Sequence, residues 1–135
     1  MARYNTFQDA FGKVWEYFVV ERHPQAMADD GYCAWFVPAT GDKCAIGCLM
    51  TDEEASESRY YNELELRDFM RGRAIIPEGD AWFQFLNLLQ AAHDDYEPSD
   101  GDFHAFIETR LRVVANEYKL AVPGEAMNER HGEPS

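Results

Sequence analysis

The chain has 135 residues, of which 46% are hydrophobic and 14% aromatic, so it holds enough apolar material for one domain with a buried core. Its 25 acidic residues outnumber the 12 Lys and Arg, and the net charge of −13 disfavours direct binding to a phosphate backbone. No apolar run approaches the ~20 residues of a membrane span, and the first residues lack the apolar segment of an export signal, so we expect a cytoplasmic protein with reduced thiols.

Two elements are predicted in the first 50 residues. Apolar residues at helical spacing predict a helix from Thr6 to His23, with Thr6 as its N-cap. Aromatic and β-branched residues on both sides of the turn sequence PATGD then predict a β-hairpin within residues 32–50. A tight turn at Thr40-Gly41 would place Val37 opposite Cys44.

The rest of the chain is predicted to be helical. Thr51 and Glu54 form a capping-box pattern at the start of a short helix, and a second helical stretch covers about residues 63–73. Asp80 is expected to cap the next helix, and the last long helix runs from about Asp102 to Leu120.

These elements together predict an α+β fold in which a two-stranded β-hairpin packs against four or five α-helices. Residues 1–122 are expected to form a single globular domain, and residues 123–135 a polar C-terminal tail.

Three cysteines lie in or beside the predicted hairpin, at positions 33, 44 and 48. In the expected register Cys33 faces Cys48, and Cys44 lies about 13 Å further along the strand, too far for all three to bind one zinc ion. We therefore expect small buried core cysteines and no metal. The alternatives are a Cys33–Cys48 disulfide, and a zinc site in which the chain bends at Gly47 and His93 or His104 supplies the fourth ligand.

A His-Asp pair such as His93-Asp94 can bind a metal ion in phosphohydrolases, but the other candidate ligands, His23 upstream and Asp100 or Asp102 downstream, are poorly placed. We expect His93 to lie at a helix C-terminus and to interact with free carbonyl groups there. Phosphate-binding glycine loops and nucleophile motifs are absent from the sequence, so no enzymatic activity is predicted.

Two acidic clusters are the candidate partner-binding residues. Carboxylates that lie in a row on a surface can imitate the row of phosphates along a DNA strand, and an acidic surface is complementary to a basic partner. Helix capping accounts for some of the charge of each cluster but not for all of the second cluster, which contains no Lys or Arg. The first cluster is Asp52, Glu53, Glu54 and Glu57, and the second is Asp94, Asp95, Glu97, Asp100 and Asp102.

The segment from Lys43 to Leu49, Lys-Cys-Ala-Ile-Gly-Cys-Leu, resembles a strand motif of small uncharacterised phage and prophage proteins. The resemblance extends over most of residues 7–120 and departs from the group's pattern at Trp35-Phe36 and at residues 50–52. The group has no established activity, so the resemblance implies a phage context, with the host cytoplasm as location, and no catalytic residues. Because all three cysteines lie inside it, it also keeps the zinc alternative open.

Three functions are therefore considered. The first is a phage-encoded inhibitor that binds a basic, nucleic-acid-binding host defence protein, such as a CRISPR effector, through an acidic and DNA-mimicking surface. The second is a zinc-stabilised accessory module that uses the cysteines. The third is a metal-dependent phosphohydrolase that uses His93 and Asp94. Small size, acidic charge and the absence of catalytic motifs favour the first.

Overall fold

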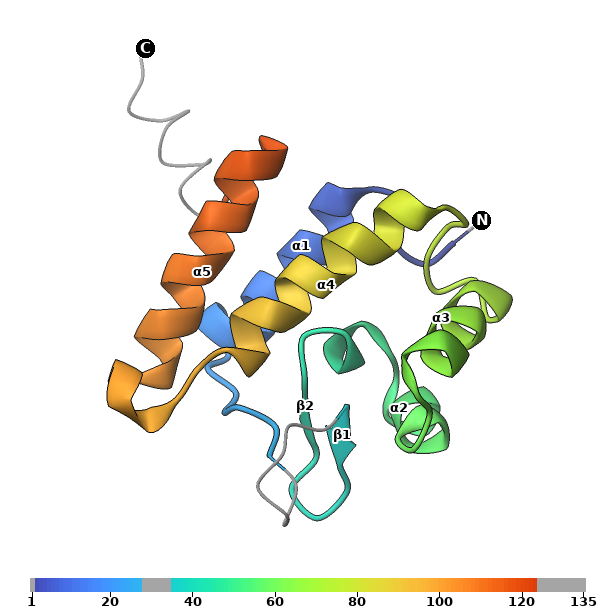
Figure 1. The fold of residues 1–135 in the computed structure, drawn as a ribbon, viewed down its shortest axis with the longest axis horizontal. Helices are drawn as coiled ribbons and strands as arrows, with labels where there is room; N and C mark the ends of the chain where they lie inside the picture. Colours follow the sequence, from blue (N-terminus) through green and yellow to red (C-terminus); the bar gives the residue numbers. More distant parts are fainter. Residues whose placement is uncertain (1, 28–34, 124–135) are drawn as a thin grey trace.

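This computed structural model describes residues 2–27 and 35–123 of the chain. These residues contain five α-helices and one two-stranded hairpin (Figure 1). The helices are α1 (Phe7–Trp15), α2 (Asp52–Ser58), α3 (Glu63–Gly72), α4 (Asp80–Asp94) and α5 (Phe103–Tyr118). The strands are β1 (Phe36–Val37) and β2 (Asp42–Lys43), and three short turns of helix are η1 (Glu16–Val20), η2 (Gly47–Leu49) and η3 (Pro98–Asp100). This mostly helical α+β architecture confirms the predicted fold class.

The core lies where α1, α4 and α5 meet. Figure 1 shows α4 crossing α1, with α5 beside them. Phe11, Phe85 and Leu111 are fully buried there, and the ring of Phe7 stacks on Phe85 at 4.4 Å. Burying each such side chain contributes about 1.5–3 kcal/mol, so these three helices form the main stable body of the described chain.

Helix starts follow local sequence rules in three predicted places. Thr6 caps α1, Asp102 caps α5, and Thr51 and Glu54 form the complete capping box of α2. The prediction for α4 is wrong, because its N-cap is Gly79, which has a φ of 130° and no side chain to cap the helix. Asp80 is instead the first helical residue and forms an ion pair with Arg67.

The hairpin is shorter than predicted, and its register differs. Phe36 pairs with Lys43 and Val37 with Asp42, so four residues form the turn and the expected opposition of Val37 and Cys44 is wrong. Gly41 adopts a positive φ of 80° in this turn. After Lys43 the chain does not continue as a strand but coils into η2, which packs on α1.

Every helix among the described residues is too short or too polar to span a lipid bilayer. The predicted tail, residues 123–135, lies outside the described residues apart from Pro123.

Candidate partner-binding groove

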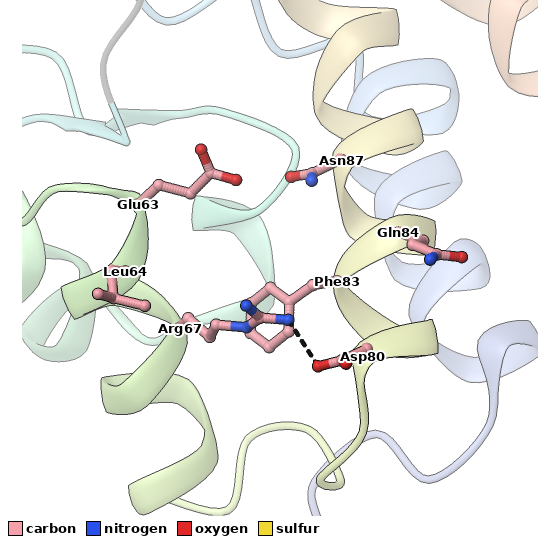
Figure 2. A pocket seen from close by; sticks show the side chains of 7 residues that line it. All are labelled: Glu63, Leu64, Arg67, Asp80, Phe83, Gln84 and Asn87. Carbon is pink, nitrogen blue, oxygen red and sulfur yellow. Dashed lines mark hydrogen bonds and ion pairs between the residues drawn. The ribbon is translucent and has the colours of Figure 1, made fainter.

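Two adjoining hollows lie between the hairpin side of the molecule, α3 and α4. The first, of about 440 Å³, is lined by the seven side chains drawn in Figure 2. The second, of about 500 Å³, is lined by Trp35, Asp94, Asp95 and further residues of α3 and α4. Glu63, Phe83 and Asn87 line both hollows, so the two are halves of one groove, which we call the acidic groove.

One face of α4 forms a wall of this groove. Its lining residues recur every three or four positions, which places them on one side of a helix with 3.6 residues per turn. They are Asp80, Phe83, Gln84, Asn87, Gln90, Ala91 and Asp94. The neighbouring stripe of Phe85, Leu86 and Leu89 is fully buried in the core. The helix is therefore held rigidly on one side while its other side remains available to a ligand.

An arginine of the protein itself occupies part of the first hollow. The guanidinium of Arg67 lies 4.4 Å from the centre of the Phe83 ring, and its Nη2 donates to Oδ1 of Asp80 at 3.0 Å (Figure 2). The Nε atom of Arg67 is buried and finds no hydrogen-bond partner among the described residues. The guanidinium is thus held by one ring face and one carboxylate.

The second hollow has an aromatic and aliphatic lining with carboxylates. Trp35, Ile46, Leu66 and Phe83 supply apolar surface, and all the ionisable side chains that line it, Glu63, Asp94 and Asp95, are acidic and belong to exposed residues. Asp95 forms an ion pair with Arg110 of α5 at 2.8 Å. This combination of apolar surface and negative charge favours a cationic ligand with a flat or partly apolar side chain.

His93 lies beside this hollow but belongs to the core. Its Nε2 accepts a hydrogen bond from the backbone N–H of Ala26 at 3.0 Å, so its proton is on Nδ1, which donates to Oδ1 of Asp94 at 2.7 Å. The same Asp94 oxygen accepts from Gln90 at 2.8 Å. The expectation that His93 interacts with free carbonyls at a helix end is therefore wrong, since the side chain is fully buried and serves as a structural link.

This arrangement also bears on the phosphohydrolase alternative. Neither ring nitrogen of His93 is free to bind a metal ion, because both are engaged within the protein. His23 is stacked on Tyr17 at 3.9 Å between ring centres and contacts Glu21. Among residues 2–27 and 35–123, no three His, Cys, Asp or Glu side chains are grouped so that they could hold a metal ion.

The second predicted acidic cluster is divided by the structure. Asp94 and Asp95 line the groove, whereas the other three members lie in the exposed connection between α4 and α5. There Asp100 accepts from the backbone N–H of Glu97 at 2.9 Å, and Asp102 caps α5 through Ala105 at 2.9 Å. Because the cluster contains no Lys or Arg, the sequence predicted that no cation would neutralise it. That prediction is wrong for Asp95, because α5 brings Arg110 to it.

The first predicted cluster is largely neutralised. Asp52 pairs with Lys43 at 2.7 Å, Glu54 with Arg3 at 2.7 Å, and Glu57 with Arg73 at 2.8 Å. Glu53 is exposed and makes no ion pair with any described residue. In Figure 1 α2 and the α4–α5 connection lie on different sides of the hairpin. The two clusters are therefore separate patches, and only the second contributes to the groove.

The two described cysteines are buried in the core, as expected, but their positions relative to each other differ from the prediction. Cys44 and Cys48 lie on one helical turn, joined by a 2.9 Å bond from the N–H of Cys48 to the carbonyl of Cys44, so the expected 13 Å separation along a strand is wrong. Both are free and buried, and burial raises the pKa of the Cys48 thiol to about 12. Cys33, the third member of the predicted zinc set, lies outside the described residues.

Glu63, Asp80 and Phe83 line the groove but were not predicted from the sequence as partner-binding residues. A signal was present in α4, where polar and acidic residues follow a second stripe beside the apolar core stripe. The sequence could not show that this stripe forms a wall of the groove, because that depends on the position of α3.

Comparison of the chain with known proteins finds no matching family model, no similar curated protein and no similar solved structure.

Proposed function

We propose that this protein is a small phage-type inhibitor that binds a basic, nucleic-acid-binding host defence protein, such as a CRISPR effector, through the acidic groove. The observation that carries this proposal is the second hollow, in which Glu63, Asp94 and Asp95 border an apolar lining. Lys and Arg side chains that normally contact phosphates are complementary to such a surface in charge.

The exposed connection after α4 supports the mimicry of nucleic acid. The acidic surface continues beyond the end of the groove at the C-terminus of α4. There Glu97, Asp100 and Asp102 are all exposed. A row of carboxylates can occupy the positions on a cationic channel that phosphates otherwise fill, and it steers a basic partner during association.

The phage context rests on the resemblance of the Lys43–Leu49 segment. In the structure this segment forms the end of β2 and the buried turn through η2, where Cys44 and Ala45 are fully buried. The residues of the motif therefore contribute to the buried core, whereas the proposed contact surface lies on α3 and α4.

The test measures binding to a partner captured from host lysate and identified by mass spectrometry. The groove variant is the double substitution Glu63→Gln and Asp95→Asn. The control variant is Glu16→Gln and Glu117→Gln, which changes the net charge equally at two exposed residues that line neither hollow. We expect the groove variant to weaken binding at least about tenfold and the control to change it little.

Salt provides the second readout. Raising the ionic strength from about 50 to about 300 mM should weaken the complex, because contacts between exposed charges are screened. Equal loss of affinity in the two variants would reduce the effect to net charge alone. Binding that is indifferent to salt and to both variants would contradict the proposed interface.

A further inference from the structure

The protein already shows how its groove holds a guanidinium group. Arg67 is held on the face of Phe83 and paired with Asp80, and the guanidinium of Arg71 also lies 5.7 Å from the centre of the same ring. The first hollow is therefore partly filled by an arginine of the chain itself (Figure 2).

The second hollow offers the same kinds of groups without a basic lining residue. Trp35 and Phe83 supply aromatic surface, and Glu63 supplies a carboxylate that forms no ion pair with any other described residue. Its volume of about 500 Å³ is within the range of binding pockets and is ample for one long side chain.

We propose that the second hollow receives an arginine side chain of the basic partner, with its guanidinium against Trp35 and paired with Glu63. This inference rests on the proposed function and names the chemical group that the groove recognises. Arginine is favoured over lysine because its guanidinium is planar, weakly hydrated and able to stack on an aromatic ring, whereas an ammonium group keeps its water more strongly.

The position of Trp35 is fixed before any partner binds. Its indole Nε1 donates to the carbonyl of Tyr61 at 3.4 Å, and its own carbonyl accepts from the N–H of Cys44 at 3.1 Å. A ring held in this way loses little conformational freedom on binding, which favours recognition of a side chain of matching shape.

The experiment compares hexa-arginine and hexa-lysine peptides as probes of the full-length, ¹⁵N-labelled protein. These peptides carry equal charge, so net electrostatic attraction alone predicts similar affinities. We expect hexa-arginine to bind about tenfold more tightly and to shift the indole N–H resonance of Trp35, which a Trp35→Phe variant identifies. The indole of Trp15, which is 4% exposed, serves as the internal reference and should not shift.

Two variants test the assigned contacts. Trp35→Leu should abolish the preference for arginine, and Glu63→Gln should weaken hexa-arginine binding more than Glu117→Gln does. Because Glu63 is exposed, Glu63→Gln should leave the fold intact. This variant therefore tests the site even if Trp35→Leu impairs folding.

The outcomes separate the two proposals. Equal, salt-dependent binding of both peptides, unaffected by the Trp35 and Glu63 variants, would overturn the arginine site and leave the acidic-surface function standing. Absence of binding by either peptide would overturn the arginine site as well, and the lysate partner and its groove variant would then decide the proposed function separately.

Discussion

Gly47 shows how a single residue positions the groove. A Cβ atom at this position would lie 2.2 Å from the backbone carbonyl oxygen of Trp35, a contact that no side-chain rotation can relieve. The absence of a side chain lets the first residue of η2 pack directly against Trp35, which lines the second hollow. Trp35 and Gly47 thus determine each other's position.

The substitution Gly47→Ala should therefore destabilise the protein by about 1–3 kcal/mol, because backbone must shift to admit the methyl group. Denaturant unfolding measures this, and Gly12→Ala is the matched control. Gly12 lies inside α1, where a Cβ atom would meet no other atom within 4 Å, so alanine there should stabilise by about 0.5–1 kcal/mol. Equal stability of the Gly47→Ala variant and the wild type would contradict the close approach.

At the scale of elements, one ion pair attaches the N-terminal segment to α2. Arg3 donates to both carboxylate oxygens of Glu54, at 2.7 and 2.8 Å, and to the carbonyl of Leu49 at 3.2 Å. The backbone N–H groups of Arg3 and Tyr4 also donate to the carbonyls of Ala74 and Ile75. The guanidinium of Arg3 lowers the pKa of Glu54 to about 2.

This shift predicts a defined pH dependence. The pKa of Glu54 is about 2 in the folded state and near its ordinary value of 4.5 in the unfolded state, so the unfolded state binds more protons on acidification. The stabilisation is fully present above about pH 5 and is lost as the pH falls towards about 2.

The difference in unfolding free energy between wild type and Glu54→Gln should therefore be largest at neutral pH and shrink on acidification. Denaturant unfolding at a series of pH values measures it. Glu53→Gln, at an exposed neighbour without an ion pair among the described residues, should show a much flatter difference. A constant difference for Glu54→Gln across the range would show that the ion pair does not stabilise the fold.

Which elements the sequence could predict depends on the range of the interactions that define them. The start of α2 depends on Thr51 and Glu54, three residues apart, and was predicted correctly. The turn that follows β2 brings Gly47 against the backbone of Trp35, and the neutralisation of Asp95 depends on Arg110, which comes from the next helix. Local patterns carry no information on these longer contacts. The hairpin register was wrong for a different reason, because its turn has four residues, 38–41, where a tight turn at Thr40-Gly41 was expected.

The candidate site was predicted only in part for the same reason. Asp94 and Asp95 were identified from a stretch without Lys or Arg, and the structure places both in the groove. Glu63 joins them only because α3 lies opposite α4, which no spacing along one helix reveals. Of the aromatic lining, Trp35 was interpreted from the sequence as part of the hairpin and Phe83 was not identified, because burial and binding select the same residue types.

For the whole molecule, the distribution of charge separates two effects of the acidic residues. Pairs such as Asp52–Lys43 and Glu57–Arg73 each include an exposed carboxylate that water screens, so each contributes at most about 1 kcal/mol. The excess of 25 acidic over 12 basic residues instead acts over the entire surface, where unbalanced like charges repel and oppose compaction.

These two effects predict opposite responses to salt. Screening removes both the local attraction and the general repulsion, but the repulsion involves many more pairs of charges and longer distances. The melting temperature at pH 7 should therefore rise by a few degrees between about 10 and 150 mM NaCl. Differential scanning calorimetry measures this rise, which should shrink at about pH 4.5, where Asp and Glu are partly protonated and the net charge falls. A melting temperature that falls with salt at pH 7 would mean that the ion pairs outweigh the repulsion. The acidic residues would then be neutralised by cations of the protein itself and would not be available to a basic partner.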